Sequence, residues 1–171
     1  MKVIEIRRHS IRESGEHLSQ KGVTLARKIG ENSPKYARVT TSTLPRAFET
    51  AIAMGFAVDE QLEMLSVMGP EVDSEIYWNS PYETFAQKMT GGSRLEIFAN
   101  ELRTLIERIA IEISDNAHAL VITHGGIVQA IAAACLPDCD HSKLGGPPSY
   151  CEGIELHFEK NSIAGFKSLK V

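Results

Sequence analysis

The sequence lacks the features that mark several large classes of protein. It has only three cysteines, an odd number without CxxC pairs, which argues against a disulfide framework and against a zinc site built from thiolates. Its net charge of −4 gives no global positive field that would attract nucleic acid or an anionic membrane. No apolar run has the length of a bilayer span, and the chain starts without the apolar segment of a signal peptide. We therefore predict a cytoplasmic protein without nucleic-acid or membrane partners, and its oligomeric state stays open.

What the sequence does contain is enough apolar residues, 43%, to form the core of a single domain over residues 1–171. Predicted strands cover "VIEIRR", "ARVTTS", "HALVIT" and a terminal hairpin from "GIELHFE" to "SIAGFKSL". Predicted helices lie between these strands, in "LSQKGVTLARKIGE", "PRAFETAIAM", residues 95–113 and "IVQAIAAAC". This alternation predicts the α/β class, as a three-layer α/β/α sandwich with a mostly parallel central sheet and an antiparallel edge hairpin.

Residues 56–92 interrupt this alternation. They carry Pro70, Pro81 and a Gly-Gly pair, and we interpret them as an irregular excursion over the core with a short helix near Ser80. Tyr77 and Trp78 in this excursion either cover a pocket or anchor the loop to the core.

Polar residues follow three of the predicted strands at the points where these strands end. Ligands bind outside the carboxyl ends of strands in such sheets, so neighbouring strands would bring these residues to one pocket. Two guanidinium groups can bind a phosphoryl group, a neutral imidazole can attack phosphorus, and a second imidazole can stabilise the oxygen charge. N–H groups of a glycine turn and the following helix add anion-binding dipoles. The residues concerned are Arg8, His9, Ser42, Arg46, His124 and Gly125.

At these residues the sequence resembles the histidine phosphatase superfamily, also called phosphoglycerate mutase-like. "RRHS" is similar to its Arg-His-Gly motif, and "LSQKGVTLARKIGE" is similar to its Leu-Thr-x-x-Gly helix. "TSTLPRAFETA" and "VITHGGIVQAI" are similar to its Ser-x-Leu-x-Arg-Ala-x-x-Thr-Ala segment and its second-histidine segment. Together these motifs cover most of the chain. The resemblance implies a phosphoglycerate mutase-like fold and a phosphatase without metal or organic cofactor, whose substrate is a small-molecule phosphate ester, a phosphohistidine-type group or a phosphoprotein.

The same resemblance implies a role for each matching residue. His9 is the nucleophile that becomes phosphorylated, Arg8 and Arg46 bind the phosphoryl group, and His124 completes the pocket. Ser42 supports the pocket.

The sequence departs from the family motif at two positions close to this histidine. Ser10 replaces the usual glycine, where it either adds a hydroxyl donor for substrate or narrows the loop. Gly15 stands where many members have asparagine, and Arg12 either reaches the site in its place or lies on the surface.

The general acid is the second open question. Family members have a glutamate after the "RAxxTA" helix, and Met64 occupies the corresponding position here. Glu63 and Glu71 are the candidates, followed by Asp73. If none reaches the site, the enzyme would favour good leaving groups such as phosphohistidine or an acyl phosphate. Further along, "TGGSRLEIF" lies where relatives have a Gly-Glu-Ser stretch of the substrate pocket. Either Arg94 and Tyr82 contact substrate, or capping by Ser93 and ordinary packing explain this stretch equally well.

Two other functions stay open at this stage. One is phosphoglycerate mutase-type phosphoryl transfer, for which the chain lacks the extra segments that enclose substrate in the glycolytic mutases. The other is a non-catalytic phosphoryl-binding module, which Ser10 and the missing acid would suit.

Overall fold

Six strands form one sheet in the order β3-β2-β4-β1-β5-β6. The structure is a computed structural model that describes residues 1–171. The strands are β1 (Lys2–Arg8), β2 (Tyr36–Ser42), β3 (Glu60–Leu62), β4 (His118–Thr123), β5 (Gly153–Glu159) and β6 (Ser162–Leu169). The helices are α1 (Gln20–Glu31), α2 (Pro45–Ala53), α3 (Pro70–Asp73), α4 (Tyr82–Lys88), α5 (Arg94–Glu112) and α6 (Ile127–Cys135), with short 3-10 helices at Glu63–Leu65 and His141–Leu144.

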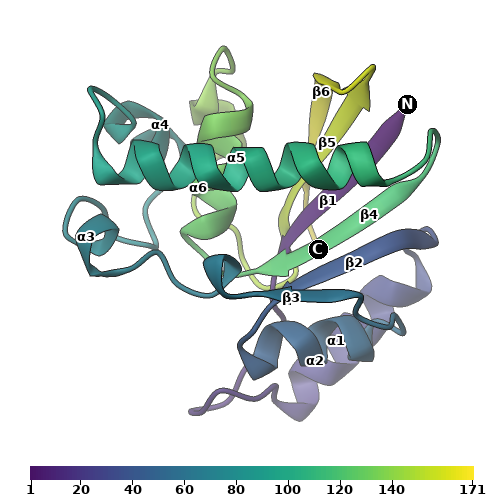
Figure 1. The fold of residues 1–171 in the computed structure, drawn as a ribbon. Helices are drawn as coiled ribbons and strands as arrows, with labels where there is room; N and C mark the ends of the chain where they lie inside the picture. Colours follow the sequence, from purple (N-terminus) through teal and green to yellow (C-terminus); the bar gives the residue numbers. More distant parts are fainter.

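The sheet is mostly parallel, as the alternation of strands and helices predicted. β4 lies between β1 and β2 and is parallel to both, and β3 is parallel to β2. β5 and β6 form the predicted hairpin, which adds to β1 in the antiparallel direction. Figure 1 shows α1 and α2 on one face of the sheet and α5 and α6 on the other. The three-layer α/β/α prediction is therefore confirmed.

Two apolar clusters, one on each face, hold these layers together. β4 supplies both, because successive side chains of a strand point to opposite faces. Leu120 and Ile122 pack with Ala47 and Ala51 under α1 and α2. Ala119 and Val121 face the larger cluster formed with α5 and α6. Each helix buries its apolar stripe against a strand that is buried on both sides, so the carboxyl ends of the strands are held in fixed positions.

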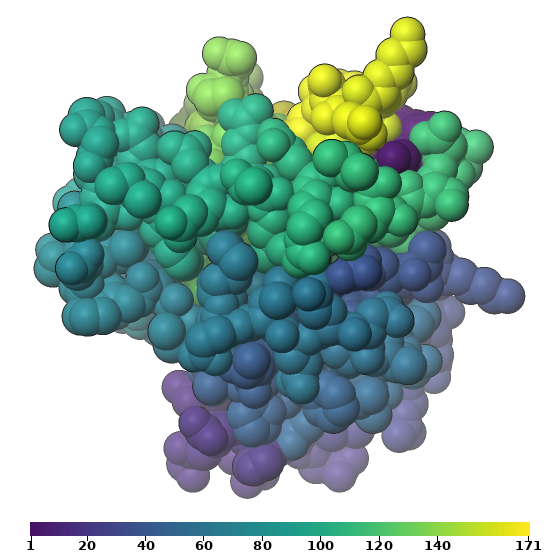
Figure 2. Space-filling view, in the orientation of Figure 1, coloured from purple at the N-terminus to yellow at the C-terminus, as the bar shows by residue number.

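The excursion of residues 56–92 is more ordered than its composition predicted. It contains the edge strand β3, the one-turn helix α3 and α4, of which only α4 was expected. Figure 2 shows the side chains of α5 and of this excursion covering one face of the molecule together. Tyr82 and Phe85 of α4 are buried in the core, so Tyr82 has a packing role. No helix of the chain is both long and apolar enough to cross a membrane.

Candidate active site

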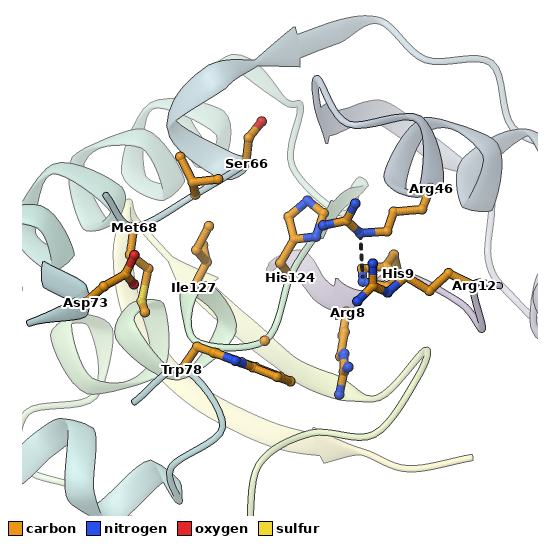
Figure 3. A pocket seen from close by; sticks show the side chains of 12 residues that line it. Arg8, His9, Arg12, Arg46, Ser66, Met68, Asp73, Trp78, His124 and Ile127 are labelled. Atoms are coloured by element: carbon orange, nitrogen blue, oxygen red, sulfur yellow. Dashed lines mark hydrogen bonds between the residues drawn. The ribbon is translucent and has the colours of Figure 1, made fainter. Parts of the chain in front are cut away.

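The ends of β1, β2 and β4 meet at a cavity of about 300 Å³, as the strand-end argument predicted. Its lining combines cationic and imidazole side chains on one side with apolar side chains and one carboxylate on the other (Figure 3). The lining residues are Arg8, His9, Arg12, Arg46, Ser66, Val67, Met68, Asp73, Trp78, His124, Gly125 and Ile127.

The two adjacent arginines of β1 have different roles because they point to opposite faces of the sheet. Arg7 forms a buried ion pair with Glu5, with an N–O distance of 2.7 Å, and donates to the backbone oxygen of Cys151 at 2.8 Å. Its charge is therefore neutralised within the fold. Arg8 has no carboxylate partner and lines the cavity, so it is the arginine available to an anion.

The imidazole of His9 is held in one tautomer by two contacts. Its Nδ1 lies 2.7 Å from the backbone oxygen of Ser10, which can only accept, so Nδ1 carries the proton. Its Nε2 accepts a hydrogen bond of 3.2 Å from Nε of Arg46. Nε2 therefore presents a lone pair beside a guanidinium group. This is the arrangement that a nitrogen nucleophile for phosphorus needs.

Burial and neighbouring cations keep both histidines of the cavity neutral. Burial, then the charges of Arg46 and Arg8, lower the pKa of His9 to about 3, against the opposing effect of the bond to Ser10. Burial, then the proximity of His9 and the arginines, lower the pKa of His124 to about 2. The two ring centroids lie 5.0 Å apart. The cavity thus contains two uncharged imidazoles surrounded by cations.

Ser42 contacts this pair from behind. Its Oγ lies 2.6 Å from Nε2 of His124 and is itself approached by the backbone N–H of Leu44 at 3.3 Å. Ser42 is fully buried and does not line the cavity. This placement suits the supporting role predicted for it.

Arg8 is held between two aromatic rings. Its guanidinium carbon lies 4.5 Å from the ring centroid of Tyr150 and 5.4 Å from that of Trp78. Its Nη1 donates to the backbone oxygen of Pro148 at 3.0 Å, whereas its buried Nε has no partner. Burial lowers the pKa of Arg8, yet a guanidinium group stays charged at physiological pH. The cation is therefore fixed in orientation.

The glycine turn after β4 contributes less than predicted. Gly125 lines the cavity, but the N–H of Gly126 donates to Oε1 of Gln129 at 2.7 Å and is not free for an anion. Nε2 of Gln129 donates in turn to the backbone oxygens of Trp78 and Ser80. Gln129 thus ties the excursion to the turn that carries His124.

Besides Ser42, three more predicted site residues do not line the cavity. Ser10 is fully buried and its hydroxyl donates to the backbone oxygen of Gly22 at 2.8 Å, so it fastens the first loop to α1 and offers substrate no donor. Glu63 accepts a hydrogen bond from Thr43 and is exposed outside the cavity. Glu71 is 69% exposed and pairs with Arg94 at 3.3 Å, which also places Arg94 outside the cavity.

The structure brings other residues to the cavity instead. Arg12 lines it while its side chain is also exposed to solvent, and Trp78 both lines it and packs on Gly125. Asp73, third among the acid candidates, is the carboxylate that the cavity contains. Tyr150 was missed, although its ring centroid lies 5.7 Å from that of His9. The sequence holds one indication of it: β5 is antiparallel to β1, so the residues just before β5 lie at the carboxyl end of β1.

No family model and no curated protein matches the chain. Among solved structures, mycobacterial glucosyl-3-phosphoglycerate phosphatase in complex with VO3 has a TM-score of 0.68 at 19% identity, covering 98% of this chain and 97% of the other. Phosphoserine phosphatase from Entamoeba histolytica has a TM-score of 0.66 at 14% identity, covering 99% and 98%. Phosphoglycerate mutase from Bacillus anthracis has a TM-score of 0.66 at 17% identity, covering 99% and 92%.

These matches extend over nearly the whole of each chain. The chain therefore has the phosphoglycerate mutase-like fold of the histidine phosphatases, which the motifs implied. At these identities the likeness concerns the fold.

Proposed function

We propose that this chain is a histidine phosphatase that hydrolyses small phosphomonoesters through a phosphohistidine on Nε2 of His9. The observation that carries the proposal is the orientation of this ring: Nδ1 donates to Ser10, and Nε2 holds its lone pair beside Arg46 in the cavity. A structural histidine on a strand end would not need a neutral ring surrounded by three arginines. The names of two fold neighbours, both phosphatases, favour the same reading.

In the first step Nε2 attacks phosphorus, an N–P bond forms and the P–O bond to the leaving group breaks. The guanidinium groups of the cavity stabilise the negative charge on the phosphoryl oxygens in the transition state. They belong to Arg8, Arg12 and Arg46. The leaving oxygen departs with the electron pair and takes up a proton from solvent water. In the second step water attacks the phosphohistidine, the N–P bond breaks, the lone pair returns to Nε2, and phosphate leaves while the attacking water releases its proton to solvent.

Protonation of the leaving group is the step for which the cavity offers the fewest suitable groups. Glu63 and Glu71 lie outside the cavity, and Asp73 lies at the end opposite the arginines. His124 is neutral at physiological pH because its pKa is lowered to about 2. We therefore propose a preference for leaving groups that depart without a strong acid, such as phenols, acyl groups and phosphorylated nitrogen. We propose a cytoplasmic location for this activity.

A phosphoryl-enzyme trap tests this function. Wild-type protein is incubated with p-nitrophenyl phosphate, quenched in alkali, which preserves phosphohistidine, and analysed by mass spectrometry of the peptide around residue 9. We expect one phosphoryl group on His9, and its loss in His9→Ala together with at least a ~1000-fold fall in kcat. The matched control is His157→Ala, which removes a histidine of the terminal hairpin that pairs with Glu155. Full turnover in His9→Ala would refute the proposal.

The same assay separates the two rival functions. Vanadate binding without any turnover would indicate a phosphoryl-binding module. Phosphoryl transfer from a bisphosphoglycerate primer to 3-phosphoglycerate would indicate a mutase, the activity in the name of the third fold neighbour.

A further inference from the structure

The cavity has a distinct charge layout beyond the phosphoryl pocket. Arg8, Arg12 and Arg46 gather at one end, whereas Asp73 lies at the opposite end and points its carboxylate inward (Figure 3). Between these ends the wall is apolar and is formed by Met68, Trp78 and Ile127. The cavity is thus positive, then apolar, then negative along its length.

The carboxylate of Asp73 is available to bind a ligand. It ends the one-turn helix α3, its side chain is exposed, and its carboxylate has no hydrogen bond or ion pair within the chain. The two nearby glutamates are both engaged: Glu71 pairs with Arg94, and Glu75 accepts from the backbone N–H groups of Arg94 and Leu95. The backbone amide of Asp73 is bonded to Gly69, so the residue is held in place while its charge is unpaired.

The walls between the two ends are fixed rather than loose. Trp78 lies against Gly125, where an added Cβ would come within 3.0 Å of the indole, and its backbone oxygen is held by Gln129. Met68 packs on Gly126 in the same way. A volume of about 300 Å³ is at the lower end for ligand pockets, which points to a substrate with a short apolar body.

We propose, resting on the phosphatase function above, that the preferred substrate is a small phosphomonoester whose leaving group is an apolar body that ends in an amine. The phosphoryl group binds at the arginines, the body lies along Met68, Trp78 and Ile127, and the ammonium group faces Asp73. A substrate carboxylate in place of the ammonium group would be repelled by the like charge of Asp73. The layout therefore selects against phosphorylated hydroxy acids, which include the substrates of a phosphoglycerate mutase.

Three aryl phosphates of similar shape test this inference. Tyramine O-phosphate carries an ammonium tail, para-ethylphenyl phosphate a neutral tail and para-(carboxyethyl)phenyl phosphate an anionic tail. All three release a phenol of similar acidity, so a change in proton donation affects them alike. We expect kcat/KM to fall in the order ammonium, neutral, carboxylate, with about fivefold between the first two, the upper range for an exposed ion pair.

Substitution of the carboxylate identifies its role. In Asp73→Asn the ratio of kcat/KM between the ammonium and neutral substrates should fall to about one. Asp115→Asn makes the same chemical change on an exposed residue at the amino end of β4, and it should keep the wild-type ratio. An equal loss on all three substrates in Asp73→Asn would show proton donation instead of recognition, and would overturn the inference.

The two proposals fail in different ways. No turnover of p-nitrophenyl phosphate by the wild-type protein would overturn the phosphatase function. Turnover of that substrate and of the aryl series without any preference for the ammonium tail would overturn only the inference about the substrate.

Discussion

The hydroxyl of Ser42, at the end of β2, lies 2.6 Å from Nε2 of His124, just beyond the end of β4. The Leu44 N–H occupies one lone pair of this oxygen, and we expect the hydroxyl proton to point at Nε2 of His124. The ring of His124 then carries its proton on Nδ1, a buried atom with no partner in the chain. The pair thus fixes the tautomer of the second histidine and leaves it an unused donor.

This contact makes Ser42→Ala informative. Without the hydroxyl, Nε2 of His124 loses its donor, and we expect the proton to redistribute between the two nitrogens. Loss of one buried hydrogen bond predicts a fall of roughly tenfold in kcat/KM. Nitrogen NMR of the histidine ring reports the tautomer directly. Ser33→Ala deletes a hydroxyl that bonds only to Ile29 at the end of α1, so it is the control. An unchanged His124 spectrum in Ser42→Ala would contradict the assignment.

The aromatic rings around Arg8 give a second prediction. Tyr150→Leu removes the nearer ring, 4.5 Å from the guanidinium carbon, and should weaken vanadate binding by about three- to tenfold, the usual range for a partly buried cation–π contact. Tyr150→Phe retains the ring and should bind vanadate almost as the wild type does. A titration with vanadate gives the affinity, and the melting temperature shows whether the fold is intact. Equal losses in both variants would assign the effect to the phenol hydroxyl instead of the ring.

Most of the fold could be predicted because its elements have strong periodicity. The apolar face of α5 and the continuous apolar run of β4 each indicate their structure without tertiary context. β3 could not be found in this way. It has three residues, Glu60–Leu62, none of them buried, and it is a strand only because its backbone pairs with β2.

The site residues also fall into two groups: those that follow regular strands could be predicted, and those that come from the irregular excursion could not. Arg8, His9 and His124 follow regular strands, so the rule that carboxyl ends share one edge located them. Asp73 and Trp78 come from the irregular excursion, whose path depends on tertiary contacts such as the bond from Gln129 to the Trp78 backbone. Glu63 and Glu71 were better matches to the family motif than Asp73. The excursion nevertheless turns both of them away from the cavity.

The pH dependence of the reaction follows from the lowered pKa of His9. For an ordinary histidine with a pKa near 6.5, the neutral fraction would fall about eightfold between pH 7 and about pH 5.5. Burial and the arginines lower the pKa of His9 to about 3, so its neutral form persists through this range. We expect kcat/KM for p-nitrophenyl phosphate, corrected for titration of the substrate, to stay constant over the same pH range. A fall of about eightfold in kcat/KM would show that the nucleophile titrates as an ordinary histidine.

Both cavity histidines also make the stability of the fold depend on pH. Each has a pKa far below its unfolded value, so between pH 6.5 and the folded pKa the unfolded chain binds more protons than the native one. The free energy of unfolding must therefore decrease as pH falls through this range. At about pH 4.5 the upper estimate is roughly 2 to 3 kcal/mol for each histidine.

A double variant isolates this contribution from that of other titrating groups. His9→Asn with His124→Asn replaces both imidazoles by amides that do not titrate. We expect the variant to lose less stability than the wild type between pH 7 and about pH 4.5, whatever its stability at pH 7. Urea unfolding at the two pH values, followed by circular dichroism, measures the difference. Equal losses in the two proteins would mean that the imidazoles take up protons in the native state, and the neutral nucleophile would then have to be abandoned.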